Sequence, residues 1–267
     1  MSRLDERFEV LRARGEPALL PFLTAGDPDL DTTEALLLAM AEAGADVIEI
    51  GFPFSDPIAD GPTIQRASQR AIASGTTLRA VLEMVKRVRP RIDVPLVLMG
   101  YANNVLAMGP ERFAEAASAA GVDAVIVVDL PPEEGAEFFA ACREAGIDPV
   151  MLVAPTSTPE RIERLVAESR GFLYYVSLTG VTSARASLAE GIEQGVRGIR
   201  RHGSIPVCVG FGISSPEHAE RVGRYADGVV VGSAIVDRIE SADSRAEMID
   251  AVATFVAELK APLRRPR

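Results

Sequence analysis

Short apolar runs alternate with polar, Ala-, Leu- and Glu-rich stretches along most of the chain. Most of these runs end in Gly, Thr or Asp, and a polar turn follows before the next stretch with helical periodicity. Apolar runs of this length, bounded by turn residues, predict buried strands, and the stretches between them predict helices. Eight strands are predicted, over residues 19–24, 46–51, 95–101, 123–129, 149–153, 172–177, 206–210 and 227–232.

The predicted helices begin at recognisable signals. Thr158 and Ser215 each stand before Pro-Glu, which places an N-cap candidate ahead of proline at the first helical position. Residues 62–90 are too long for one helix and divide near Gly75, so we expect an extra helix there. Further helices are predicted from an acidic turn at 31–34, from Pro110-Glu111 to near Gly121, and from Pro132-Glu133-Glu134 to near Gly146.

Strict alternation of strand and helix, without a break in composition, favours one domain over residues 1–267 with a parallel sheet. An open, doubly wound sheet would alternate in the same way. Eight units without a linker favour closure into a (β/α)₈ TIM barrel, with an extra helix between strands two and three. Residues 1–14 form an amphipathic pattern that predicts a further, N-terminal helix capping the barrel floor, and residues 263–267 are predicted to be a disordered tail.

Charge and composition exclude several classes of protein. The formal net charge is −10, and the final Arg-rich tail is the one basic block, which argues against binding to nucleic acid or to a membrane surface. No apolar run is long enough to span a bilayer, and the charged first 14 residues resemble neither a signal nor a transit peptide. Two cysteines do not make a disulfide framework, so we expect a cytoplasmic protein.

Two acids stand out in the segment 46–61. Glu49 interrupts the apolar run 47–50, where an ionised carboxylate is costly unless it is paired or used. Asp60 lies in the polar loop that follows, at the strand end where barrels carry their active sites. Glu49 could instead pair with an interior arginine, and Asp60 could cap the helix that begins at Pro62.

The few lysines and histidines of the chain limit the catalytic mechanisms that it could use. The two lysines, Lys86 and Lys260, fall on predicted outer helices, so a Schiff-base mechanism is not expected. The two histidines, His202 and His218, form no ligand cluster, which argues against a His-based metal site but leaves an acidic magnesium site open. General acid–base catalysis by carboxylates is the chemistry that these residues favour.

A second group of candidates lies after the late strands. The glycines of 210–214 and 232–236 let backbone N–H groups approach an anion, at the position where barrels bind phosphate. They could equally serve tight turns. Other polar and aromatic residues at the predicted mouth have structural alternatives: Asp129 as a turn or cap residue, and Tyr101, Tyr174, Phe22 and Phe211 as packing residues.

Residues 48–65, IEIGFPFSDPIADGPTIQ, resemble the signature of the tryptophan synthase α subunits nearly residue for residue. Supporting segments follow in the family order over most of the chain, at residues 21–28, 100–103, 180–182, 210–214 and 232–236. One position departs from the family pattern, since Ser183 stands where a glycine is usual. The signature is specific, whereas the glycine motifs alone are shared with many phosphate-binding barrels.

The resemblance implies a function and a set of site residues. It implies retro-aldol cleavage of indole-3-glycerol phosphate to indole and glyceraldehyde 3-phosphate, with no cofactor and no metal in this chain. Glu49 would be the acid–base group, and Asp60 would hydrogen-bond the indole N–H. Substrate contacts would come from aromatic side chains for the ring and from backbone donors for the phosphate: Phe22, Tyr101, Tyr174, Thr182, Ser183, Phe211, Gly212, Gly232 and Ser233.

The resemblance also implies a partner, a pyridoxal-phosphate (PLP) β subunit that receives indole through a tunnel in an αββα (α₂β₂) complex. The loops after strands two and six would face it, with Pro53 and Asn103-Asn104 in or near the contact. Two alternatives remain at this point. One is a free-standing lyase with the same residues, and the other is a phosphate-binding barrel without catalysis, against which the presence of both acids speaks.

Overall fold

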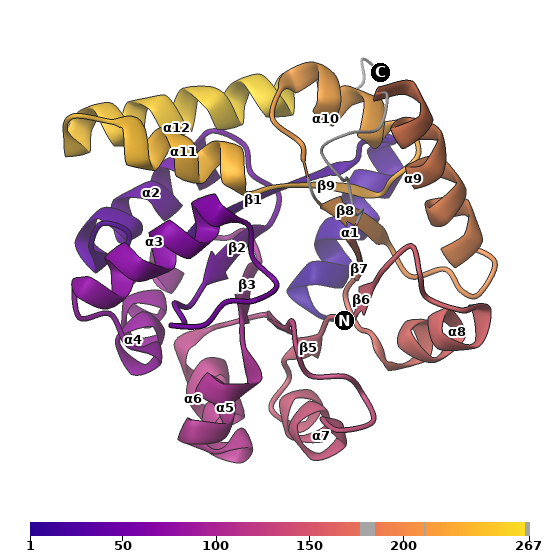
Figure 1. Ribbon diagram of the computed structural model, residues 1–267, viewed down its shortest axis with the longest axis horizontal. Helices are drawn as coiled ribbons and strands as arrows, with labels where there is room; N and C mark the ends of the chain where they lie inside the picture. The colour runs from indigo at the N-terminus through magenta and orange to yellow at the C-terminus, as the bar shows by residue number, and fades with distance from the viewer. Residues whose placement is uncertain (177–184, 211, 265–267) are drawn as a thin grey trace.

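The computed structural model describes residues 1–176, 185–210 and 212–264, and the side chains of 185–190 are not described. Strands occupy the centre and helices surround them (Figure 1). The strands are β1 Ala18–Thr24, β2 Ile48–Gly51, β3 Leu96–Gly100, β4 Ala124–Val127, β5 Asp148–Pro149, β6 Leu152–Val153, β7 Leu173–Val176, β8 Val207–Gly210 and β9 Gly228–Val231.

The helices follow the strands in nearly regular alternation. They are α1 Arg3–Arg14, α2 Leu30–Glu42, α3 Pro62–Ala73, α4 Leu78–Val88, α5 Ala102–Met108, α6 Pro110–Ala120, α7 Ala136–Glu144, α8 Pro159–Glu168, α9 Arg185–Ile199, α10 Pro216–Gly223, α11 Ser233–Ser241 and α12 Arg245–Lys260. Short 3₁₀ turns lie at Arg89–Arg91 and Ala261–Leu263. None of the helices in the described part of the chain is long and apolar enough to cross a membrane.

The sheet closes through the predicted fifth strand. All strand pairs are parallel, in the order β5-β4-β3-β2-β1-β9-β8-β7-β6. The two ends of this order, β5 and β6, are two halves of the one predicted strand at 149–153. Val150 donates its N–H to Val125 of β4 at 2.9 Å, and Met151 accepts from Tyr174 of β7 at 2.9 Å. The segment therefore bridges both neighbours, and the prediction of a (β/α)₈ barrel is confirmed.

The predicted extra helices are confirmed. Residues 62–90 form α3 and α4, separated by the turn at Gly75, whose φ is +83°. The N-terminal helix α1 lies behind the strands in Figure 1 and buries Leu4, Phe8 and Leu11. These side chains join a cluster with inward-facing strand residues, and the rings of Phe8 and Phe172 lie 6.0 Å apart. Helix α1 therefore covers the floor of the barrel.

Three details differ from the sequence expectations. Helix α7 begins at Ala136 rather than Pro132, because residues 131–135 form a turn in which Gly135 donates to the Pro131 carbonyl at 2.9 Å. The short helix α5, after β3, was not predicted. The tail was expected to be disordered from residue 263, but Leu263 is buried in the 3₁₀ turn against the core, so that boundary was wrong.

Candidate active site

Glu49 points into the barrel from β2. Parallel pairing places it beside Phe22 of β1 and Val97 of β3. Val47, two residues earlier and hence on the same face of the strand, belongs to the inward-facing cluster. Glu49 is fully buried, and neither carboxylate oxygen has a hydrogen-bond partner in the described part of the chain. Glu49 is thus not paired with an interior arginine among the described residues.

Burial without a partner changes the protonation of Glu49. Removal from water disfavours the charged carboxylate and raises the pKa of Glu49 to about 8. At neutral pH this side chain is therefore mostly protonated. A buried carboxyl with a pKa near the working pH is suited both to donate and to accept a proton.

Asp60 lies at the end of the loop that leaves β2. Its Oδ2 accepts a hydrogen bond from the Tyr101 hydroxyl at 3.1 Å, and its backbone carbonyl accepts one from the Gln65 side chain at 2.9 Å. The N-cap of α3 is Gly61, which has no side chain to bond, so Asp60 does not act as that cap. Burial raises the pKa of Asp60, while the bond from Tyr101 opposes the rise.

Tyr101 holds the loop from the end of the neighbouring strand β3. Its hydroxyl oxygen accepts from the backbone N–H of Ala59 at 3.0 Å while donating to Asp60. Its ring stacks on Phe54 of the same loop, with the ring centres 5.1 Å apart. Burial and the nearby Asp60 carboxylate raise the pKa of Tyr101, so the hydroxyl remains a donor. Tyr101 therefore holds both the Ala59 backbone and the Asp60 carboxylate.

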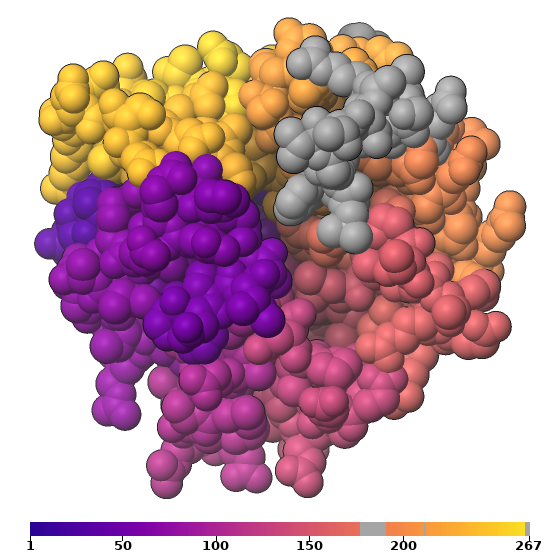
Figure 2. All heavy atoms as spheres, viewed as in Figure 1, coloured from indigo at the N-terminus to yellow at the C-terminus, as the bar shows by residue number. Residues whose placement is uncertain are grey.

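A pocket opens beside Asp60 and Tyr101, and Glu49 is not among the residues that line it. Figure 2 shows the loop and α3, in violet, raised beside a hollow near the middle of this face. The pocket is lined by predicted site residues and their neighbours: Phe22, Thr24, Gly51, Phe52, Asp60, Ile64, Ser68, Met99, Gly100, Tyr101 and Val128. Thr24, Ile64, Ser68 and Met99 were not among the predicted site residues. Ile64 and Ser68 stand four residues apart on α3, a spacing that could have identified them.

Tyr174 lies on the far wall of the barrel interior. It is buried on β7, and its hydroxyl lies 2.1 Å from where a Cβ on Gly210 would stand, so β8 needs a glycine there. Burial raises the pKa of Tyr174 well above its usual value, and the nearby Glu49 raises it further. Tyr174 and Glu49 therefore share the barrel interior.

The glycines after β8 and β9 lie at the same rim. Gly212 has a φ of +73°, which favours glycine. Gly232 is the N-cap of α11, and its carbonyl accepts from Ile235 and Val236 at 2.8 and 3.1 Å. The first N–H groups of a helix have no partner within it, so Ser233 opens a turn suited to an anion. Phe22 reaches this rim too, since its ring would lie 3.4 Å from a Cβ on Gly232.

Three predicted site residues, Thr182, Ser183 and Phe211, lie outside the described residues. Asp129 accepts from the first backbone N–H of α5, at Ala102, with a distance of 2.7 Å, which is the cap alternative considered for it. Lys260 is on α12 as predicted, but it is buried and bonds Asp46 at 2.8 Å, at the opposite end of β2 from Asp60. No group of three His, Cys, Asp or Glu among the described residues could hold a metal ion.

Comparisons with known proteins agree with the sequence resemblance. The family model described as tryptophan synthase alpha chain matches residues 8–264. The tryptophan synthase alpha chains of Citrifermentans bemidjiense and Geobacter sulfurreducens are each 54% identical over 260 residues, covering 97% of this chain and 97% and 98% of theirs.

Solved structures give the same result. An aminoacrylate-bound tryptophan synthase from M. tuberculosis contains a chain that is 37% identical, with a TM-score of 0.89 and coverage of 99% of this chain and 100% of that chain. The tryptophan synthase alpha chain from Legionella pneumophila subsp. pneumophila is 35% identical, with a TM-score of 0.90 and coverage of 98% and 97%.

Proposed function

The chain belongs to the tryptophan synthase alpha chain family, and from that premise we propose that Glu49 and Asp60 divide the chemistry of its reaction between them. The reaction is the cleavage of indole-3-glycerol phosphate to indole and glyceraldehyde 3-phosphate, carried out with a β-subunit partner. A lyase that works without a partner and a barrel without catalysis are not favoured.

The bond to be broken joins indole C3 to the glycerol carbon that bears the adjacent hydroxyl. Glu49, protonated near neutral pH, donates its proton to C3, which becomes tetrahedral while positive charge spreads to the ring nitrogen. The carboxylate so formed accepts the hydroxyl proton as the C–C bond breaks. The electron pair of that bond restores the indole ring, the hydroxyl carbon becomes the aldehyde, and Glu49 returns to its starting state.

Asp60 stabilises the positive charge that develops on the indole ring during this step. Its carboxylate would accept a hydrogen bond from the indole N–H and stabilise the positive charge building on the ring, an interaction stronger in the transition state than in the ground state. The bond from Tyr101 at 3.1 Å orients the carboxylate before substrate arrives. Tyr101 bonds Oδ2, and we assign the other carboxylate oxygen, Oδ1, as the acceptor for the indole nitrogen.

The rest of the substrate fits the same edge of the barrel. Phe22, Tyr101 and Tyr174 supply apolar walls for the indole ring, and Phe211 joins this proposal from its place in the sequence. The backbone N–H groups of Gly212, Gly232 and Ser233 would bind the phosphate, with Thr182 and Ser183 as further contacts from the family pattern. The α chain itself needs no cofactor for these steps, and PLP belongs to the proposed β partner.

One observation carries this assignment: Glu49 is fully buried in the barrel interior without a partner in the described part of the chain. A structural carboxyl in such a place would be hydrogen-bonded, since an unsatisfied buried polar group is costly whether charged or neutral. We also propose a cytoplasmic location, which the two free buried cysteines suit.

The test is a lyase assay on the purified protein with indole-3-glycerol phosphate, with and without a β subunit. Glu49→Gln removes the proton-transfer group, so its turnover should fall about 10³-fold, within the usual range for general acid–base catalysis. Asp60→Asn keeps a hydrogen-bonding group but loses the charge, so it should fall about 10²-fold. Full activity of Glu49→Gln, with the wild-type protein active, would rule out the proposed role.

A further inference from the structure

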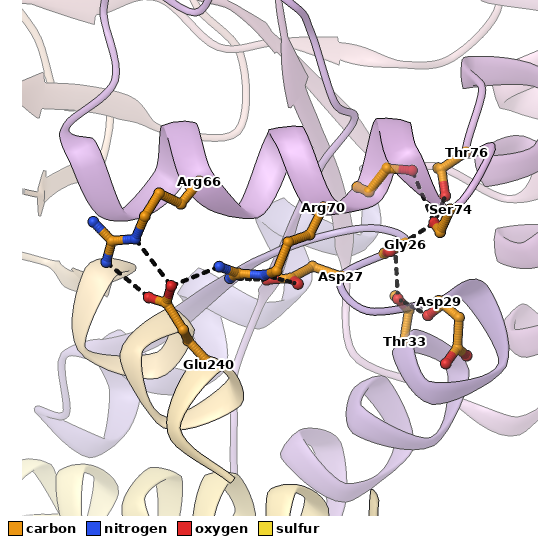
Figure 3. Close-up of polar contacts among 10 residues, drawn as sticks. Gly26, Asp27, Asp29, Thr33, Arg66, Arg70, Ser74, Thr76 and Glu240 are labelled. Carbon is orange, nitrogen blue, oxygen red and sulfur yellow. Dashed lines mark hydrogen bonds and ion pairs between the residues drawn. The ribbon is translucent and has the colours of Figure 1, made fainter. Parts of the chain in front are cut away.

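A line of ion pairs joins α3 to α11 and to the loop after β1 (Figure 3). Arg66 of α3 donates two bonds to Glu240 of α11, at 2.9 and 2.7 Å. Arg70, one turn further along α3, donates to Glu240 at 2.7 Å and makes a two-bond pair with Asp27 at 2.7 and 2.8 Å. These four residues, which we name the α3–α11 clasp, are not part of the catalytic site described above.

The clasp is anchored on a buried and hydrogen-bonded segment after β1. Asp27 is 1% exposed, and the neighbouring Gly26 is held on both sides. Its N–H donates to the Thr33 hydroxyl at 2.9 Å, and its carbonyl accepts from the Ser74 hydroxyl at 3.1 Å, as Figure 3 shows. A Cβ on Gly26 would lie 1.9 Å from the Thr76 hydroxyl, so the loop and the end of α3 are in close contact.

Each helix of the clasp begins at one end of the proposed substrate site. Helix α3 starts two residues after Asp60, and Gln65 in its first turn bonds the Asp60 carbonyl at 2.9 Å. Helix α11 starts at Ser233, the proposed phosphate end. A further bond between the two helices joins the Thr63 hydroxyl to Asp237 at 3.1 Å. A change in the position of α3 on α11 would therefore change the spacing between Asp60 and the phosphate donors.

The apolar contact between α3 and α11 would by itself fix the spacing between Asp60 and the phosphate donors only weakly. The contact between the helices under the clasp is a small cluster of Phe22, Ile64, Ala67 and Val236, separate from the main core. Small apolar surfaces permit sliding, whereas paired guanidinium and carboxylate groups accept one geometry. Ion pairs that are partly buried add little net stability, and one attested use of them is to fix a unique arrangement.

We propose that the α3–α11 clasp is a positioning device, which sets Asp60 at the correct distance from the phosphate-binding turn and transmits phosphate binding at α11 to the Asp60 loop. Glu240 and Arg70 are then positioning residues for the lyase reaction, since they act through Asp60 and touch no substrate. This inference rests on the proposed roles of Asp60 and Ser233. The clasp persists over a wide pH range, because its arginines lower the pKa of Glu240 to about 2.

The first experiment is a double-mutant cycle on lyase turnover. Glu240→Gln removes the charge that both arginines share, and we expect about a tenfold loss of kcat, less than the ~10²-fold that a 1 Å misplacement can cause. In the Asp60→Asn background the same change should cost nothing further, because the group being positioned is already lost. Equal losses in both backgrounds would overturn the proposal and leave the clasp a structural feature only.

The second experiment uses inorganic phosphate as the probe and amide hydrogen exchange as the readout, so it does not depend on turnover. In the wild-type protein, saturating phosphate should slow exchange over residues 59–65. Glu240→Gln should still bind phosphate, tested at saturation, but lose this slowing. The same slowing in both proteins, or none in the wild type, would overturn the proposal. An inactive wild-type protein that still shows the predicted exchange would instead count against the proposed function.

The matched control is Glu220→Gln. Glu220 pairs with Arg224 at 2.8 Å on α10, an exposed Arg–Glu pair that touches neither α3 nor α11. It tests whether removing an equivalent surface charge affects either readout. We expect kcat and phosphate-induced protection to match the wild type, and a loss equal to that of Glu240→Gln would show that the effect is not specific to the clasp.

Discussion

Asp46 and Glu49 are buried acids three residues apart, at the floor and in the interior of the same barrel, and their surroundings are opposite. Asp46 stands just before β2 and accepts bonds from the Leu19 N–H and from Lys260, both at 2.8 Å. Glu49 stands within β2, is equally buried, and has no partner in the described part of the chain.

The same contrast extends around the floor. Asp123, before β4, pairs with Arg3 and Arg89 and accepts from the Leu96 N–H at 2.7 Å. Asp46 and Asp123 are thus satisfied and join strand starts to helices, whereas both carboxylate oxygens of Glu49 are without a partner in the described part of the chain. An unpaired buried carboxyl lowers stability, and such groups concentrate at functional sites. The difference separates acids that hold the barrel together from the acid for which we propose proton transfer.

The largest effect on stability is expected from replacing the floor acid Asp46 by its amide. Asp46→Asn leaves the buried Lys260 without its near carboxylate, since Glu16 is 3.7 Å away. Breaking a buried pair costs about 3–5 kcal/mol, so the free energy of unfolding should fall by that amount in denaturant titrations. The kcat of the folded variant should be unchanged.

Glu49→Gln is the matched variant and should show the inverse result, with stability kept and turnover lost. The contrast fails if Asp46→Asn reduces kcat as strongly as Glu49→Gln does, or if both substitutions destabilise the protein equally.

An effect of similar size should appear in the pH dependence of stability. The folded protein holds the Glu49 proton up to a pH of about 8, whereas the unfolded chain releases it near its usual value of 4.5. The unfolded state therefore binds fewer protons between these values, and stability should fall as pH rises, by about 1.4 kcal/mol per unit. This contribution is complete below the unfolded pKa and is lost as pH rises through the folded one.

Glu49→Gln isolates this contribution, because the amide does not titrate. The difference in unfolding free energy between wild type and variant should shift in favour of the variant from pH 5 to pH 8. A difference that stays constant over this range would indicate a Glu49 carboxyl that titrates alike in both states.

Most of the barrel could be predicted from the sequence because its strands are apolar runs that end in turn residues. The strands and the paired helices α3 and α4 were found in this way, each from local patterning. The start of α7 at Ala136 was missed because two prolines open a turn that resembles a helix start in sequence. The fifth strand appeared continuous, since its division arises from hydrogen bonds to two different neighbours.

In the candidate site, too, features with a local sequence signal were predicted and features that depend on long-range packing were not. Glu49 and Asp60 were identifiable because a charge in an apolar run and an acid in a mouth loop are local signals. The pairing of Asp46 with Lys260 joins residues 214 positions apart, and that of Arg70 with Asp27 joins residues 43 apart. Such pairs depend on which helix faces meet, which periodicity does not specify. The lack of a partner at Glu49 is likewise a property of the packed interior.

The most direct test is a ¹³C NMR titration of the Glu49 side-chain carboxyl, assigned by comparison with Glu49→Gln. A neutral carboxyl at the start of the reaction is what allows Glu49 to protonate indole C3. We expect a titration midpoint at a pH of about 8 in the substrate-free protein. A midpoint near 4.5, the usual glutamate value, would mean that the side chain is ionised at neutral pH, and would contradict its role as the proton donor.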